Sequence, residues 1–254
     1  FMSTQINTFV INLPFDKDRR DFMVSELTNL AIPHTIVSAT IGKDLSIEEI
    51  NSLYDKNLSL EENGYSLSNT QIACADSHRR IYEKIVENNL PWALILEDDV
   101  KLSPKIKSLL TDDFVKRSQA DWIQIDYVPA NMNYLKNWIK IAWNQKVPLK
   151  TKLFKITLRF PAIILWSIFE RTRDILTKTP RATWFQRPLY LASAYIVTNE
   201  GAKKLLPLTH PIRYAADSLQ NVAPTKVGLK IKGVVPLLSN QLRSRFSSNL
   251  TYDS

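Results

Sequence analysis

The most constraining feature of this chain is a short apolar run that ends in three consecutive acids. Residues 92–96 are all apolar, and Glu97, Asp98 and Asp99 follow them directly. An apolar run of this length favours a buried strand over a helix. Three adjacent carboxylates at the end of such a strand repel one another and lose hydration. We therefore expect a positive partner, and Mg²⁺ or Mn²⁺ is suitable because hard cations bind carboxylate oxygen.

Predicted strands and helices alternate along the chain. Apolar runs predict further strands over residues 8–13, 34–37, 121–126, 190–197 and 229–235. Helical spacing and capping signals predict helices over residues 16–30, 46–54, 68–88 and 199–205. This alternation predicts an α/β fold with a mixed, mostly parallel sheet flanked by helices. In such sheets ligands bind at the carboxyl ends of strands, where the three acids lie.

Length and composition indicate one globular domain over residues 1–254. Hydrophobic residues make up 44% of the 254 positions, enough for a substantial core. Cys74 is the single cysteine, so no intramolecular disulfide can form, and we expect a buried structural thiol in a reducing compartment. No signal peptide or membrane-spanning run is recognisable. We expect a cytoplasmic protein.

The positive charge is concentrated in residues 136–181, within a predicted helical insertion at about 131–183. This segment holds eleven Lys and Arg against two acids, a net +9, whereas the whole chain carries +8. Residues 160–169 inside it are nearly all apolar. A basic amphipathic segment of this kind is typical of peripheral attachment to an anionic membrane. The alternatives are a helix that packs on the domain or on a second subunit, and a nucleic-acid surface, which the apolar run disfavours.

Four segments together resemble glycosyltransferase family 25, which includes bacterial lipooligosaccharide galactosyltransferases and relatives of the collagen galactosyltransferases. They are residues 9–13 with 18–20, residues 72–78 with 81–82, residues 93–100, and residues 194–197 with 200–205 followed by Asp217. The resemblance implies a Rossmann-like GT-A fold. It also implies metal-dependent, inverting transfer of a hexose, with galactose from UDP-galactose as the first expectation, onto a lipooligosaccharide acceptor at the cytoplasmic face of the inner membrane.

This chemistry assigns provisional roles around the acids. We expect Asp99, with Asp98 as a second or water-mediated ligand, to hold Mn²⁺ or Mg²⁺, which would stabilise the leaving diphosphate. The residues expected to contact the UDP-sugar are Asn12, Arg19, Arg20, His78, Glu97 and Asp98. The alternative donors are UDP-glucose and UDP-N-acetylhexosamine.

An inverting transfer also needs a base for the acceptor hydroxyl. Asp217 is the first candidate and Asp126 the second, and Trp184, Phe185 and Tyr190 are candidates for stacking on the acceptor sugar. A different enzyme class, a Mg²⁺-dependent phosphohydrolase or nucleotidyltransferase, could use the same acids. The chain has no Gly-x-x-x-x-Gly-Lys-Ser/Thr loop, which argues against a P-loop enzyme.

Overall fold

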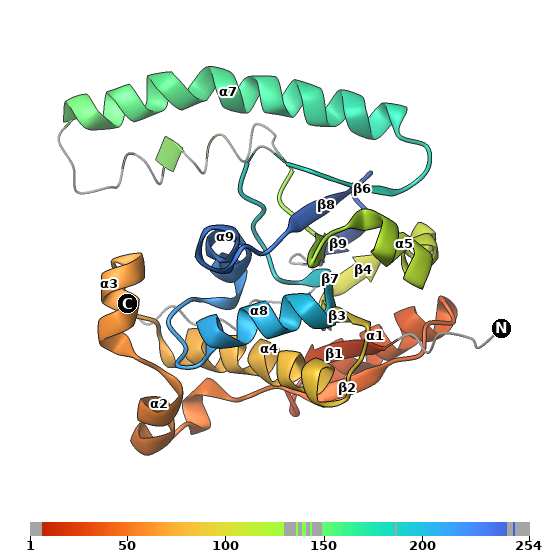
Figure 1. Cartoon of the computed structure of the whole chain (residues 1–254), viewed down its shortest axis with the longest axis vertical. Coiled ribbons are helices and arrows are strands. Elements are labelled where there is room, and N and C mark those ends of the chain that lie inside the picture. Colours follow the sequence, from red (N-terminus) through yellow and green to blue (C-terminus); the bar gives the residue numbers. More distant parts are fainter. Residues whose placement is uncertain are drawn as a thin grey trace.

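A computed structural model describes residues 7–129, 136, 139–140, 143, 149–185, 187–242 and 246. A seven-stranded sheet with strand order β2-β1-β3-β7-β5-β8-β6 forms the centre of the molecule (Figure 1). Its strands are β1 (Thr8–Asn12), β2 (Thr35–Ser38), β3 (Trp92–Glu97), β5 (Trp122–Gln124), β6 (Arg181–Thr183), β7 (Ala194–Thr198) and β8 (Ile231–Val235). β6 and β7 run opposite to the other five. The expected mixed, mostly parallel α/β sheet is confirmed.

Helices cover both faces of this sheet. They are α1 (Lys17–Asn29), α2 (Ile47–Leu53), α3 (Lys56–Asn63), α4 (Asn69–Glu87), α5 (Asp112–Ser118), α7 (Leu149–Leu176), α8 (Asn199–Thr209) and α9 (Ala216–Val227), with 3₁₀ turns η1 (Gly42–Asp44) and η2 (Pro104–Leu109). One buried cluster joins the sheet to α1, η2 and α5, and a second joins it to α4, α8 and α9. The described residues therefore form a helix–sheet–helix sandwich around two apolar layers.

β3 lies at the centre of both layers. Leu94 and Leu96 belong to one buried cluster and Ala93 and Ile95 to the other. Successive side chains of a strand point to opposite faces, so a strand covered on both sides must be apolar throughout. The continuous apolar run that the sequence displays is thus the consequence of helices on both faces.

Most element boundaries agree with the sequence prediction, but the ends of several elements differ. The strand expected from residue 190 begins only at Ala194, because Leu191 adopts a left-handed backbone with φ of 85° that no strand accommodates. The helix expected to end at residue 205 continues to Thr209, with Pro207 inside it. Because β5 ends at Gln124, Asp126 lies just beyond the carboxyl end of its strand.

The basic segment contains α7, which lies along the outer margin of the molecule (Figure 1), and β6, which returns the chain to the sheet beside β8. Residues 130–135, 137–138, 141–142 and 144–148 of this region lie outside the described residues. α7 is 28 residues long. No helix among the described residues combines the length and the hydropathy needed to cross a membrane.

Candidate active site

The acids at the end of β3 are held in a tight turn. Asp98 and Asp99 connect β3 directly to the short strand β4 (Val100–Leu102), which pairs with β9 (Ser239–Gln241) near the C-terminus. The backbone amide of Leu242 donates to the carbonyl oxygen of Asp99 at 2.8 Å. This second, two-stranded sheet keeps the turn beside the carboxyl end of β1, the neighbour of β3.

Asp98 is neutralised by the protein itself. Its side chain is buried, and its two oxygens accept hydrogen bonds of 2.8 Å from Asn12 Nδ2 and from Arg19 Nη1. Asn12 ends β1, whereas Arg19 reaches the turn from the first turns of α1. Part of the positive charge that the sequence led us to expect from a cation is therefore supplied by Arg19.

Asp99 is less completely satisfied than Asp98. Arg19 Nη1 lies 3.4 Å from Asp99 Oδ2, and the buried Oδ1 has no hydrogen-bond partner among the described residues. Burial, together with the negative charge of Glu97, raises the pKa of Asp99 to about 6. An unpartnered, buried carboxylate oxygen is a suitable ligand for a hard divalent cation. Of the two predicted metal ligands, Asp99 fits that role better, because both oxygens of Asp98 are occupied.

A second group of polar side chains surrounds Glu97. His78 Nε2 lies 3.7 Å from Glu97 Oε1 and has no hydrogen-bond partner in the described part of the chain. The other ring nitrogen, Nδ1, shares a hydrogen bond of 2.7 Å with the hydroxyl of Tyr195. The side chains of Cys74, His78 and Glu97 lie within 4.8 Å of one another and could also hold a metal ion. Burial raises the pKa of the Cys74 thiol, which disfavours a thiolate there.

The two candidate bases differ in their surroundings. Asp217 lies in the first turn of α9 and is exposed. Partial desolvation by neighbouring residues, together with the negative charge of Glu97, raises the pKa of its carboxyl. Asp126 is buried, and its carboxylate accepts a hydrogen bond from the hydroxyl of Ser193. Asp217 is thus the more accessible of the two, and it is electrostatically coupled to Glu97.

Three predicted site residues have no described contact with this cluster. Arg20 faces Asp21, with 3.8 Å between Nε and Oδ1. Trp184 is exposed and has the ammonium of Lys232 5.1 Å from its ring centre. Tyr190 is also exposed.

Tyr195 and Gln241 are site residues that the sequence interpretation did not single out. Tyr195 stacks on Trp122 with ring centres 3.8 Å apart and orients His78 through its hydroxyl. Gln241 Nε2 lies 3.4 Å from Glu97 Oε2, and its side chain also bonds Asp99. The tyrosine lies within a recognised strand segment, whereas nothing near Gln241 in the sequence relates it to residues 97–99.

Comparison with known proteins agrees with this geometry. The sequence profile of glycosyltransferase family 25, described as an LPS biosynthesis protein, matches residues 5–220. The chain belongs to glycosyltransferase family 25. This membership favours sugar transfer over the phosphohydrolase and nucleotidyltransferase alternatives.

Relatives within the family differ in how much of each chain they share with this one. Human procollagen galactosyltransferase 2 is 33% identical over 45% of this chain and 19% of its own length. A glycosyltransferase candidate of Haemophilus influenzae is 26% identical over 84% of this chain and 62% of its own. The inactive human family member 3 is 31% identical over 40% of this chain and 18% of its own. The matched regions span about a fifth of the human proteins.

The raised pKa of Asp99 predicts a pH-dependent stability in metal-free buffer. The carboxyl is protonated in both states below about pH 3.8, so it then has no effect on the free energy of unfolding. As pH rises towards 6, only the unfolded state releases the proton, and the ionised carboxylate then destabilises the native state by up to about 3 kcal/mol. Asp99→Asn should therefore unfold at higher denaturant concentration than wild type at pH 8, and at the same concentration near pH 3.5.

Chemical denaturation over this pH range, with Asp21→Asn as an exposed control, measures the effect. A variant less stable than wild type at pH 8 would contradict the assignment of Asp99 as a destabilised, ligand-ready carboxylate.

Proposed function

We propose that this protein transfers a hexose, with galactose as the first expectation, from a UDP-sugar to a sugar of a lipooligosaccharide acceptor, in a metal-dependent, inverting reaction. The observation that carries the proposal is the buried, unpartnered Oδ1 of Asp99 beside the ion pair of Asp98 with Arg19. The names of the procollagen galactosyltransferases support galactose, and the family description supports a lipopolysaccharide-type acceptor. UDP-glucose and UDP-N-acetylhexosamine are the alternative donors.

Different residues of the chain would have different roles in binding the donor. Asp99 would hold Mn²⁺ or Mg²⁺, with Asp98 behind it as the residue that fixes Arg19. When bound, the cation would neutralise charge that develops on the diphosphate. Glu97 and His78 lie beside this position and offer a carboxylate acceptor and a ring nitrogen to the ribose and phosphates of the donor. Asn12 and Arg19 keep Asp98 in place, which makes their role one of positioning.

The proposed base is Asp217 on α9. Asp217 would accept the proton of the acceptor hydroxyl while that oxygen bonds to the anomeric carbon and the bond from that carbon to the UDP oxygen breaks. A carboxyl with a raised pKa is a stronger base than an ordinary aspartate, and the pKa of Asp217 is raised. Asp126 remains the alternative, although its bond to Ser193 and its burial leave it less accessible.

A donor screen tests the reaction. We expect release of UDP from UDP-galactose in the presence of a lipooligosaccharide acceptor and Mn²⁺, and no release in excess EDTA. Asp99→Asn should abolish turnover, whereas Asp21→Asn, an equal change of charge at an exposed position, should retain it. Full activity in EDTA would refute metal dependence, and a preference for another UDP-sugar would replace galactose.

The base assignment has its own test. Asp217→Asn should lose turnover by ~10²–10⁴-fold and keep donor binding, because the amide cannot accept the proton but leaves the donor residues untouched. Turnover numbers and calorimetric affinities for the UDP-sugar separate the two effects. The same measurement on Asp126→Asn is the comparison, and near-normal turnover of Asp217→Asn would move the role elsewhere.

We also propose that α7 attaches the enzyme to an anionic membrane, where a lipid-linked acceptor would lie. The helix carries apolar side chains outward: Leu165, Ile168 and Ile175 are 65%, 59% and 73% exposed. These positions recur at helical spacing on one face. Arg171 and Lys178 are exposed near them, and cations beside apolar anchors favour the headgroup layer of anionic lipid.

Sedimentation with vesicles tests this attachment. Wild type should pellet with phosphatidylglycerol-containing vesicles, less so at high salt, and serine at Leu165, Ile168 and Ile175 should remove binding. Serine at Ile47 and Leu60, which are 73% and 45% exposed on α2 and α3, is the control. Recovery in the supernatant with and without vesicles would refute docking, and dimerisation through this face would replace the lipid with a second copy.

A further inference from the structure

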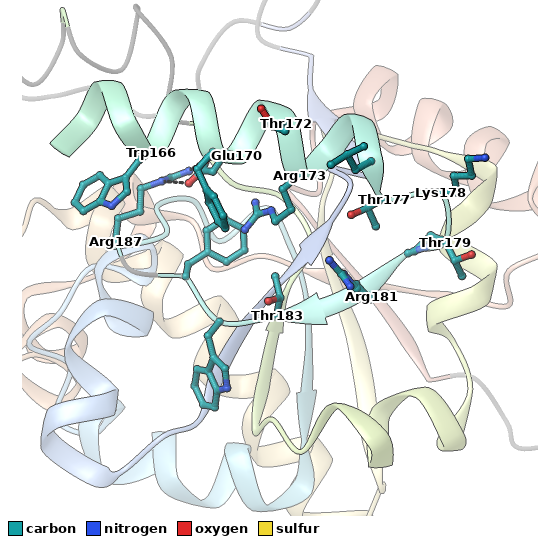
Figure 2. Close-up of a pocket in the computed structure, with 15 residues that line it drawn as sticks. Trp166, Glu170, Thr172, Arg173, Thr177, Lys178, Thr179, Arg181, Thr183 and Arg187 are labelled. Atoms are coloured by element: carbon teal, nitrogen blue, oxygen red, sulfur yellow. Dashed lines mark hydrogen bonds and ion pairs between the residues drawn. The ribbon is translucent and has the colours of Figure 1, made fainter. Parts of the chain in front are cut away.

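A cavity of about 810 Å³ lies between α7 and the β6 region, away from the acids of β3 (Figure 2). Figure 2 shows Arg173 reaching into it from α7, and Arg181 and Thr183 reaching into it from β6. From α7, its lining combines the charged side chains of Glu170 and Arg173 with the aromatic side chains of Trp166 and Phe169. The sequence interpretation assigned no ligand to this space.

One inward charge is fully neutralised. Glu170 and Arg187 are both buried, and the guanidinium of Arg187 donates from Nε and Nη2 to the two carboxylate oxygens of Glu170 at 2.6 and 2.8 Å. A bidentate pair of this kind is strongly directional. It fixes the inward face of α7 against the segment that follows β6, so the cavity has a rigid wall.

A second inward charge, that of Arg173, is only partly compensated. The side chain of Arg173 is only 9% exposed, and its Nε and Nη2 have no hydrogen-bond partner among the described residues. The nearest acid is Asp174, whose Oδ1 lies 3.6 Å from Nη2, beyond hydrogen-bond distance. A buried guanidinium with unused N–H groups is costly unless something accepts from them. Nη1, the one nitrogen of the guanidinium's three that is not enclosed in this way, could donate to an anion in the cavity.

Aromatic rings and further cations complete the walls. The guanidinium carbon of Arg173 lies 4.3 Å from the ring centre of Phe185, and Trp166 and Trp184 also line the space. Lys178 and Arg181 line it too, and neither has an acidic partner in the part of the chain that the structure describes. Flat apolar walls with a few convergent polar groups are typical of sites for small organic ligands, and here the polar groups are cationic.

Arg181, on one wall of the cavity, lies at the end of the sheet where the acids of β3 are. β6 is antiparallel to β8, and Arg181 lies opposite Val235, the last residue of β8. The carboxyl ends of β8, β5 and β3 all lie at the same end of the sheet. Four strand spacings separate β3 from β6 in the sheet order, which corresponds to roughly 19 Å. An oligosaccharide of a few sugars can span that distance.

We propose that the cavity between α7 and β6 binds an acidic group, a phosphate or carboxylate, carried by a sugar of the acceptor oligosaccharide some units from the hydroxyl that is glycosylated. Arg173 would donate to the anion in the plane of its guanidinium, Lys178 and Arg181 would add charge at the entrance, and the aromatic rings would contact the sugar. The inference rests on the proposed sugar transfer for its choice of ligand, but binding at this cavity can be measured without transfer.

The test uses a soluble phosphorylated core oligosaccharide released from lipooligosaccharide, and the same material after dephosphorylation with hydrofluoric acid. Calorimetry on the full chain, without donor or metal, should show binding of the phosphorylated form that weakens with salt, and at least about tenfold weaker binding of the dephosphorylated form. Arg173→Gln should weaken binding of the phosphorylated form by a similar factor. Arg117→Gln, the same change at an exposed position of α5, should not.

Because Arg173 is buried, a second variant guards against a folding defect. Lys178→Gln combined with Arg181→Gln changes only exposed side chains and should also weaken the phosphorylated ligand, with an unchanged thermal transition. Equal affinities for the two oligosaccharides, or full affinity in both variants, would overturn the proposal.

Vesicles of phosphatidylglycerol distinguish the glycan from a lipid headgroup. Vesicle binding should survive Arg173→Gln. If Arg173→Gln loses vesicle binding and wild type does not bind the soluble oligosaccharide, the cavity binds a phospholipid headgroup. That result would overturn the proposal of a glycan ligand. Oligosaccharide binding in a protein that transfers no UDP-sugar would support the site and refute the proposed function, so the two failures are distinguishable.

Discussion

The organisation of the candidate active site depends on how three adjacent acids are tolerated at the end of a buried strand. Arg19 provides the main compensation: its guanidinium lies 2.8 Å from Asp98 Oδ1 and 3.4 Å from Asp99 Oδ2. One cation facing two acids leaves the group negative, and Asp99 shows this in its raised pKa and its unpartnered oxygen. A protein that only needed a stable turn would gain nothing from this residual charge. A divalent cation would compensate this residual negative charge, and the bound cation could then attract a diphosphate.

Incomplete compensation of charge also occurs at α7. There, Glu170 and Arg173 are enclosed whereas Leu165, Ile168 and Ile175 are exposed, and the buried pair of Glu170 with Arg187 fixes the arrangement. Breaking one partner of a buried pair is strongly destabilising because the other charge is left uncompensated. The helix is therefore held with its apolar stripe towards the surroundings. The proposed membrane attachment and the proposed ligand site in the cavity therefore depend on the same feature, which is the face of α7 that points inward.

Local signals in the sequence were sufficient for much of the fold. The apolar runs of β1 and β3, and the capping boxes at Ser46 and Ser68, predict elements that the structure contains within a few residues. These predictions succeed because strand burial and helix capping depend on neighbouring residues. β4 and β9 escaped recognition, because each has only three residues and pairs with a partner more than a hundred positions away.

The sequence by itself determined the acids at the end of β3, the alternation of strands and helices, and the position of the basic segment. Each is a property of consecutive residues. Only the tertiary structure decided which acid is neutralised and which remains available, because Arg19 and Gln241 reach Asp99 from opposite ends of the chain. It likewise decided that the side chain of Arg173 is only 9% exposed, with Asp174 3.6 Å from Nη2 and no hydrogen bond at Nε or Nη2 among the described residues. Charge compensation acts through space, and its partners are set by how the helices pack on the sheet.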